Sequence, residues 1–160
     1  MKKRTAVILA VLMMSSLTAC GREGTLSAKN ETNANEAEEV QEDTEMKMKV
    51  EAGGSTFTAT LEDNEAAAAL VEMMEKEPVT IEMDDYSGFE KVGSLGANLP
   101  ASNSRMTTQP GDIVLYNGSQ IVMFYGSNSW SYTKLAEIDD LTGWAEALGS
   151  GSVTVTLSME

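Results

Sequence analysis

The sequence predicts a mainly β domain with two short helices, folded as a small barrel that is closed or partly closed. Several short runs alternate apolar and polar residues with a period of two, which is typical of half-buried strands. Two other runs have helical spacing, and residues 46–160 have the length of one domain. A barrel whose ends are covered by helices would bury this many alternating strands.

The domain is expected to open with a β-hairpin. Residues 46–51 alternate apolar side chains with charged ones, and residues 56–61 alternate apolar side chains with threonine. Gly53 and Gly54 lie between the two runs as a turn.

A helix and a third strand follow. Asp63 or Asn64 is the expected helix cap, and Pro78 ends the helix. The apolar stripe has helical spacing and consists of Ala66, Ala69, Leu70, Met73 and Met74. Residues 79–83 alternate again and predict a strand.

The middle of the domain is expected to be irregular. Residues 84–110 are rich in glycine, serine and asparagine, and a long loop of this kind is usually functional or mobile. Asp84 and Asp85 lie at its start. Because neighbouring strand residues point to opposite faces, we expect these two carboxylates to be solvated and not to form a catalytic pair.

The second half returns to strands. Residues 112–116 and 120–125 are rich in β-forming side chains and flank Asn117-Gly118, a strong hairpin signal.

Three shorter elements are expected to complete the domain. Residues 135–138 predict a short strand. Residues 141–148 predict a helix capped by Asp139 or Asp140, and residues 153–159 alternate as a closing strand.

The first residues resemble a bacterial export signal. Residues 2–4 are basic, and residues 6–14 form an apolar run shorter than the about 20 residues of a membrane-spanning helix. Residues 17–20 resemble a lipobox, in which the cysteine receives a lipid and the signal is cut just before it. We therefore expect residues 1–19 to be a cleaved signal peptide. Cys20 would anchor the protein to the cell membrane, facing outside the cytoplasm.

Residues 20–45 are expected to form an acidic, disordered tether. They contain few large apolar side chains and a run of like charge at residues 36–45, so they bury too little surface to offset the entropy of ordering. A cation or partner site is the alternative interpretation. We prefer a solvated spacer that holds residues 46–160 away from the membrane.

Composition excludes several classes of function. The chain has no histidine and one cysteine, which removes Ser-His and Cys-His catalysis and histidine-ligated metal sites. Its net charge of −14 disfavours nucleic acid as a partner. The methionines, among them Met46, Met48, Met83 and Met123, fall on predicted core faces and are interpreted as packing, not as soft-metal ligands. We expect no metal or other cofactor.

Three segments, taken in order, resemble the cyclophilin-like fold. Residues 49–74 resemble the first hairpin and helix of cyclophilins, and residues 109–112 (Gln-Pro-Gly-Asp) resemble the family's Gln-x-Gly-Asp turn. Residues 117–157 follow the order of the family's C-terminal half. Residues 110–116 with 124–126 resemble small bacterial cyclophilin-like proteins of unassigned function. The resemblance implies a cyclophilin-like β-barrel.

The catalytic pattern of cyclophilins, which isomerise X-Pro bonds, is not matched. Where the family has Phe-His-Arg, this chain has Phe89-Glu90-Lys91, and lysine lacks the planar fork of donors of arginine. The family's pocket histidine is missing, with Tyr132 nearest its place, while Gln109 matches the family's glutamine. We therefore expect no catalytic residues of this type.

Trp130 and Tyr132 lie in a stretch predicted to be a polar loop, where they either line a binding surface or cap one end of the barrel. The expected groove has apolar walls and a few polar side chains. Its candidate residues are Tyr86, Phe89, Lys91, Asn103, Arg105, Gln109, Trp130 and Tyr132.

Our leading hypothesis is a lipid-anchored, non-catalytic domain that binds a small molecule or an extended peptide. Two alternatives stay open. One is a weak prolyl isomerase or folding helper, for which Arg105 would have to swing in from its loop. The other is a purely structural surface protein.

Overall fold

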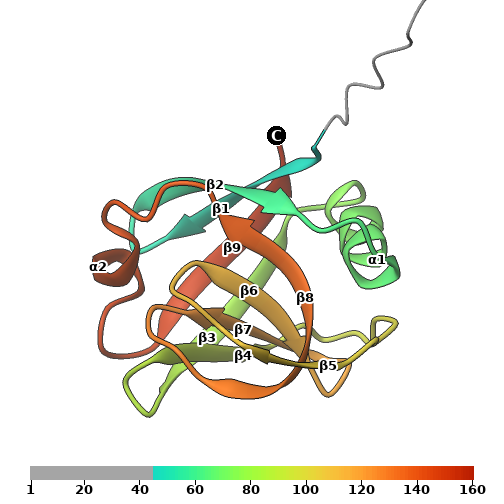
Figure 1. Ribbon diagram of the computed structural model, residues 1–160. Helices are drawn as coiled ribbons and strands as arrows, with labels where there is room; N and C mark the ends of the chain where they lie inside the picture. Colours follow the sequence, from blue (N-terminus) through green and yellow to red (C-terminus); the bar gives the residue numbers. More distant parts are fainter. Residues whose placement is uncertain (1–44) are drawn as a thin grey trace, which may run out of the picture. The chain divides into compact units, whose positions relative to one another are not determined.

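The computed structural model describes residues 45–160, which form a β-barrel accompanied by two helices (Figure 1). The expected signal peptide, Cys20 and nearly all of the expected tether lie outside the described residues. Within residues 45–160, no helix combines the length and the apolar character needed to cross a membrane.

The first hairpin forms as predicted from β1 (Lys47–Ala52) and β2 (Ser55–Leu61). Its turn needs glycine for two reasons. Gly53 has φ +56, in the left-handed region. A Cβ atom at this position would also lie 2.1 Å from the carbonyl oxygen of Ala147 in the second helix. The hairpin turn and that helix are therefore in close contact.

Helix α1 (Glu65–Met74) begins at Asn64, whose side chain accepts two hydrogen bonds from backbone N–H groups of the first turn. Its buried residues are Ala66, Ala67, Leu70, Val71 and Met74. The predicted stripe was rotated, because Ala69 and Met73 are only half-buried. The helix contacts strands β8 and β9, so packing against the barrel selects the face that is buried.

Within residues 45–160, eight antiparallel strands close into a ring (Figure 1). Following β2 and β1, the ring order is β9 (Val153–Met159), β3 (Val79–Tyr86), β4 (Glu90–Ser94), β7 (Gln120–Phe124), β6 (Asp112–Tyr116) and β8 (Ser129–Ile138). Strand β8 then pairs with β2, where Ala59 lies opposite Ile138. The sequence-based prediction of a mainly β barrel with two helices is confirmed.

Strand β8 extends beyond the predicted residues 135–138. Its first part pairs with the short strand β5 (Ser104–Thr107), in which Met106 lies opposite Trp130. Trp130 and Tyr132 therefore lie in a strand, and the prediction that they belong to a polar loop was wrong.

The pairing of β6 with β8 contains a β-bulge. Ile113 lies opposite Ala136, but the next residue, Val114, lies opposite Lys134, so Leu135 is an extra residue on β8. Because the bulge interrupts the alternation of apolar and polar residues, the sequence pattern indicated only the last part of the strand.

Residues 84–110 are more regular than predicted, since they contain the end of β3 and all of β4 and β5. The sequence pattern missed β4 because Glu90 and Lys91 are charged although both are buried. Gly93 in the same strand leaves no room for a side chain, since a Cβ atom there would lie 2.5 Å from Cγ2 of Ile81.

Helix α2 (Trp144–Leu148) starts later than the predicted residue 141. Asp140 accepts a hydrogen bond from the backbone N–H of Thr142, and Gly143 has φ +80, so these residues form a turn before the helix. The buried indole of Trp144 donates a hydrogen bond to the carbonyl oxygen of Phe124.

Among residues 45–160, the buried apolar side chains form two clusters. The larger cluster fills the barrel and includes Met48, Met83 and Met123, as predicted, whereas Met46 is 45% exposed and does not belong to it. The smaller cluster consists of Val114, Val122, Phe124 and Tyr132. Val114, Val122 and Phe124 alternate along their strands with residues of the larger cluster, so they lie on the outer face of the barrel. Tyr132 packs against Phe124 on the same face.

Candidate functional site

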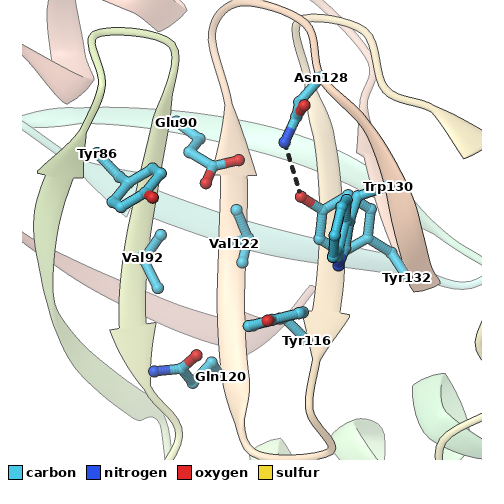
Figure 2. Close-up of a pocket in the computed structure, with 9 residues that line it drawn as sticks. All are labelled: Tyr86, Glu90, Val92, Tyr116, Gln120, Val122, Asn128, Trp130 and Tyr132. Atoms are coloured by element: carbon cyan, nitrogen blue, oxygen red, sulfur yellow. Dashed lines mark hydrogen bonds between the residues drawn. The ribbon is translucent and has the colours of Figure 1, made fainter.

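A pocket of about 460 Å³ lies on the outer face of the barrel (Figure 2). Strand alternation positions part of its lining, because Glu90 and Val92 of β4 face outward while Lys91 and Gly93 face the interior. The residues that line the pocket are Tyr86, Glu90, Val92, Tyr116, Gln120, Val122, Asn128, Trp130 and Tyr132.

Aromatic rings flank the pocket on both sides. Tyr86, at the end of β3, is 59% exposed, and Trp130 on β8 is 55% exposed. Tyr132 is buried beside them, with its ring edge-on to that of Tyr116 at a centroid distance of 6.0 Å. Asn128 Nδ2 donates a hydrogen bond of 3.1 Å to the Tyr132 hydroxyl (Figure 2), which holds this ring in place.

Glu90 is the polar group that distinguishes this pocket. Its side chain is 5% exposed, and its Oε2 atom has no hydrogen-bond partner among residues 45–160. Figure 2 shows the carboxyl group directed away from β4, between Tyr86 and Asn128 in this view. Burial raises the pKa of Glu90 to about 7, because an ionised group is unfavourable in an apolar environment unless it is paired.

The charge of Glu90 also acts on its neighbours. Burial first, and then the nearby carboxylate of Glu90, raise the pKa of the Tyr132 phenol. Burial, followed by the hydrogen bond to Asp85, the charge of Asp85 and lastly the charge of Glu90, raises the pKa of Tyr125 to about 12. No lysine or arginine lines the pocket within the described part of the chain. The site is therefore a half-open, aromatic cavity with one unpaired acid.

Comparisons with known proteins support the barrel fold. Residues 50–158 match the model of the cyclophilin-like family. The chain belongs to this family. Among solved structures, it is similar to a hypothetical protein from Archaeoglobus fulgidus determined in solution, with a TM-score of 0.50 and 12% identity over 72% of this chain and 95% of the other. That likeness shows the fold alone. No curated protein matches the chain.

Lys91 does not reach the pocket, although it was expected in the groove at the place of the cyclophilin arginine. Its side chain is fully buried on the inner side of β4, and its Nζ atom donates hydrogen bonds to Asp85 Oδ1 (2.8 Å) and to the carbonyl oxygen of Gly151 (2.6 Å). It also lies 5.5 Å from the centroid of the Tyr125 ring. All three contacts are with this chain's own groups.

Asp85 is engaged in the same cluster and is not a free, solvated carboxylate. The hydrogen bond from Lys91, followed by that from Tyr125, lowers the pKa of Asp85. Asp84, by contrast, is exposed and accepts a hydrogen bond from Ser152. The two carboxylates have different partners, in agreement with the expectation that they do not form a pair.

The structure brings together three of the eight candidate groove residues, Tyr86, Trp130 and Tyr132. The other five candidates do not line the pocket. Phe89 packs edge-on against Tyr86, with a centroid distance of 6.3 Å, but does not line the pocket.

Three polar candidates also lie outside the pocket lining. Asn103 accepts a hydrogen bond from the Thr133 hydroxyl. Arg105 is exposed on β5, opposite Ser131. Gln109 is exposed, and its backbone N–H is bound by the Asp112 carboxylate. Arg105 therefore does not lie over the pocket floor, where an isomerase mechanism would require it.

Sequence reasoning missed the polar centre of the pocket. Glu90 was noted only as part of the run that replaces Phe-His-Arg. Val92 and Val122 form the floor, and these two could have been found from the alternation within β4 and β7 once β4 was recognised. Nothing in the local sequence indicates that Glu90 is left without a partner, because that depends on which side chains of β3, β6, β7 and β8 surround it.

Proposed function

We propose that this cyclophilin-like domain is a binding module and not a prolyl isomerase, and that its outer pocket takes a small molecule or an extended peptide. The burial of Lys91 carries the proposal. Lys91, which matches the family's arginine by sequence position, is held inside the barrel by hydrogen bonds to Asp85 and to the carbonyl oxygen of Gly151. Among residues 45–160, the pocket lining offers neither a guanidinium nor an imidazole group to stabilise a twisted amide.

The shape of the pocket supports binding. Its volume of about 460 Å³ lies within the range of about 300–1,000 Å³ that is typical of ligand sites. Exposed aromatic rings such as Tyr86 and Trp130 combine a large apolar surface with a polar edge, and residues of this type dominate binding surfaces.

The proposal includes attachment to the cell membrane through a lipid on Cys20, with the domain outside the cytoplasm. The sequence around Cys20 supports it, because a basic start, a short apolar run and a small residue before the cysteine are what lipoprotein signals contain. The acidic residues 36–45 would then separate the domain from the membrane surface.

Catalysis is tested by following cis–trans isomerisation of a proline-containing tetrapeptide, which is slow without a catalyst. We expect the protein to leave this rate unchanged, whereas an ordinary cyclophilin at the same concentration accelerates it. Acceleration that disappears in Arg105→Ala would overturn the proposal, because Arg105 would then have entered the pocket.

Binding is tested by NMR, with the two tryptophan indole N–H signals as reporters. Small aromatic molecules and a proline-containing peptide are expected to shift the signal of Trp130, which lines the pocket. The signal of Trp144, which is buried and bonded to the carbonyl oxygen of Phe124, serves as an internal control. If no compound shifts either indole signal, the pocket is not a binding site and a structural role is favoured.

Anchoring is tested by expressing the whole chain and its Cys20→Ser variant in bacteria. The unchanged chain should incorporate labelled palmitate and sediment with membranes, and Cys20→Ser should do neither. Equal membrane association of the two chains would reject a lipid anchor at this position.

A further inference from the structure

The unpaired carboxyl group of Glu90 points to a particular class of ligand, provided that the pocket is a binding site as proposed above. Oε2 of Glu90 lacks a hydrogen-bond donor among the described residues, although the side chain is only 5% exposed. Buried polar atoms are nearly always paired in folded proteins, so such an atom in a cavity needs an explanation. A donor supplied by a ligand would complete it.

The surroundings of Glu90 favour a donor that is positively charged. The titratable groups around it are phenols: Tyr86 of β3, Tyr116 of β6, Tyr125 after β7 and Tyr132 of β8. The nearest pair of opposite charges, Lys91 and Asp85, is satisfied on the inner side of the sheet. Among residues 45–160, the pocket would thus present a cationic ligand with one negative charge and no competing positive charge.

The aromatic lining acts in the same direction. The faces of tyrosine and tryptophan rings attract cations within about 6 Å, and the pocket combines Tyr86, Tyr116, Trp130 and Tyr132 around its opening and walls. An anionic ligand would be repelled by Glu90, and the net charge of −14 on the chain disfavours it further.

We propose that the pocket binds an organic amine, whose ammonium group donates a hydrogen bond to Glu90 Oε2 while its apolar part lies among the aromatic rings. A quaternary ammonium ion fits less well, because it has no N–H group to offer the carboxylate. The valine floor formed by Val92 and Val122 accommodates the apolar part.

The test compares phenethylamine with 2-phenylethanol, which has a similar shape but no charge, by calorimetric titration of the purified protein at pH 8. We expect the amine to bind at least about tenfold more tightly than the alcohol. The same ammonium group occurs on lysine side chains, so Nα-acetyl-lysine amide is titrated in parallel. Tighter binding of phenethylamine identifies a free amine as the source, and tighter binding of the lysine derivative identifies a side chain.

Two variants decide whether Glu90 is responsible. Glu90→Gln keeps the shape of the side chain and should weaken amine binding at least about tenfold, with little effect on the alcohol. Glu72→Gln removes the same charge from an exposed position on α1 and is the matched control, with no more than about a twofold change expected. Lowering the pH from 8 to 5 should weaken amine binding to the unchanged protein but not to Glu90→Gln, because Glu90 then becomes protonated.

The results separate this inference from the proposed function. Equal binding of amine and alcohol, with the Trp130 indole signal shifted by both, would overturn the amine proposal and leave the binding pocket in place. An amine that binds Glu90→Gln as well as the unchanged protein would also overturn it. Failure of every probe to shift the Trp130 signal at millimolar concentration would overturn both.

Discussion

Glu90 and Lys91 are neighbours on one strand, carry opposite charges and are both buried, yet their environments differ completely. Lys91 faces the interior of the barrel, where a carboxylate, a backbone carbonyl oxygen and an aromatic ring surround its ammonium group. Glu90 faces the outer pocket, where its Oε2 atom has no hydrogen-bond partner among the described residues. The alternation of a single strand thus places one satisfied charge and one unsatisfied charge side by side.

The difference separates a structural role from the binding role that we propose for Glu90. A buried charge whose hydrogen bonds are made within the chain stabilises one arrangement of its neighbours, and removing one partner leaves the other uncompensated. A buried charge without a partner destabilises the free protein. A ligand that supplies the missing donor removes this cost, so the hydrogen bond contributes strongly to the free energy of binding. Conversely, Lys91, which was expected to line the groove, proves to be part of the barrel interior.

The largest effect is expected at Lys91. Lys91→Ala removes one partner of a buried ion pair, a change that costs about 3–5 kcal/mol in other proteins. We expect about 3 kcal/mol of unfolding free energy, at the low end, because Asp85 is 24% exposed and water can reach it. Urea unfolding measures the change, and Lys76→Ala, at an exposed residue after α1, is the control. A loss of less than about 1 kcal/mol for Lys91→Ala would show that the interior cluster is not structural.

A smaller effect with a defined pH dependence is expected at Glu90. Its pKa is about 7 in the folded protein and near 4.5 in the unfolded chain. Between these values the folded state keeps a proton that the unfolded state has lost. Stability should therefore fall as the pH rises from 4.5 to 7 and stay low above it.

Glu90→Gln should remove this decline, so that the variant gains on the order of 2 kcal/mol relative to the unchanged protein between pH 5 and pH 8. Urea unfolding at the two pH values gives the difference directly. Parallel pH profiles of the two proteins would mean that water already solvates Glu90, and the contrast with Lys91 would disappear.

A third effect, of about 1 kcal/mol, is expected from the hydrogen bond between Asn128 and Tyr132. Tyr132→Phe removes the hydroxyl that accepts it but keeps the ring that contacts Tyr116 and Phe124. Thermal unfolding should detect the loss. Tyr116→Phe is a comparison variant in the same pocket. If Tyr132→Phe is as stable as the unchanged protein, this wall of the pocket is held by ring packing alone.

The smallest effect is expected at Arg105. Its side chain is exposed on β5 and does not line the pocket. Arg105→Ala should change the unfolding free energy by less than about 0.5 kcal/mol and leave ligand binding unchanged. Weakened binding in this variant, measured by the shift of the Trp130 indole signal, would show that Arg105 contacts the bound ligand.

Much of the fold could be predicted from local sequence patterns. In these segments, the residues that the pattern marks as apolar are the ones that the folded domain buries. The hairpin of β1 and β2, the cap at Asn64 and the turn at Asn117-Gly118 all depend on residues close in sequence. Asn117 and Gly118 both have positive φ, as the predicted hairpin turn requires. Strand β4 could not be predicted, because two of its buried residues are charged and a third is glycine.

The pocket was less predictable than the fold. Tyr86, Trp130 and Tyr132 were identified because aromatic residues in polar segments often line binding surfaces. Glu90 and Lys91 differ in role only through the face on which each lies, and that face depends on the register of β4 with β3 and β7. Register is set by pairing partners distant in sequence, so the run Phe89-Glu90-Lys91 alone could not show that Glu90, and not Lys91, lines the pocket.

The extra residue at Leu135 decides which way the aromatic residues of β8 turn. Successive strand residues point to opposite sides, and Ala136 and Ile138 face inward. If β8 were regular, Tyr132 and Trp130, which lie an even number of residues earlier, would also face inward. Leu135 inserts one residue and reverses this order, so Leu135 and Ala136 both belong to the interior cluster while Tyr132 belongs to the outer one. A regular β8 of the same sequence would turn both rings toward the interior, which the larger cluster already fills. The bulge at Leu135 therefore places the two rings at the outer pocket.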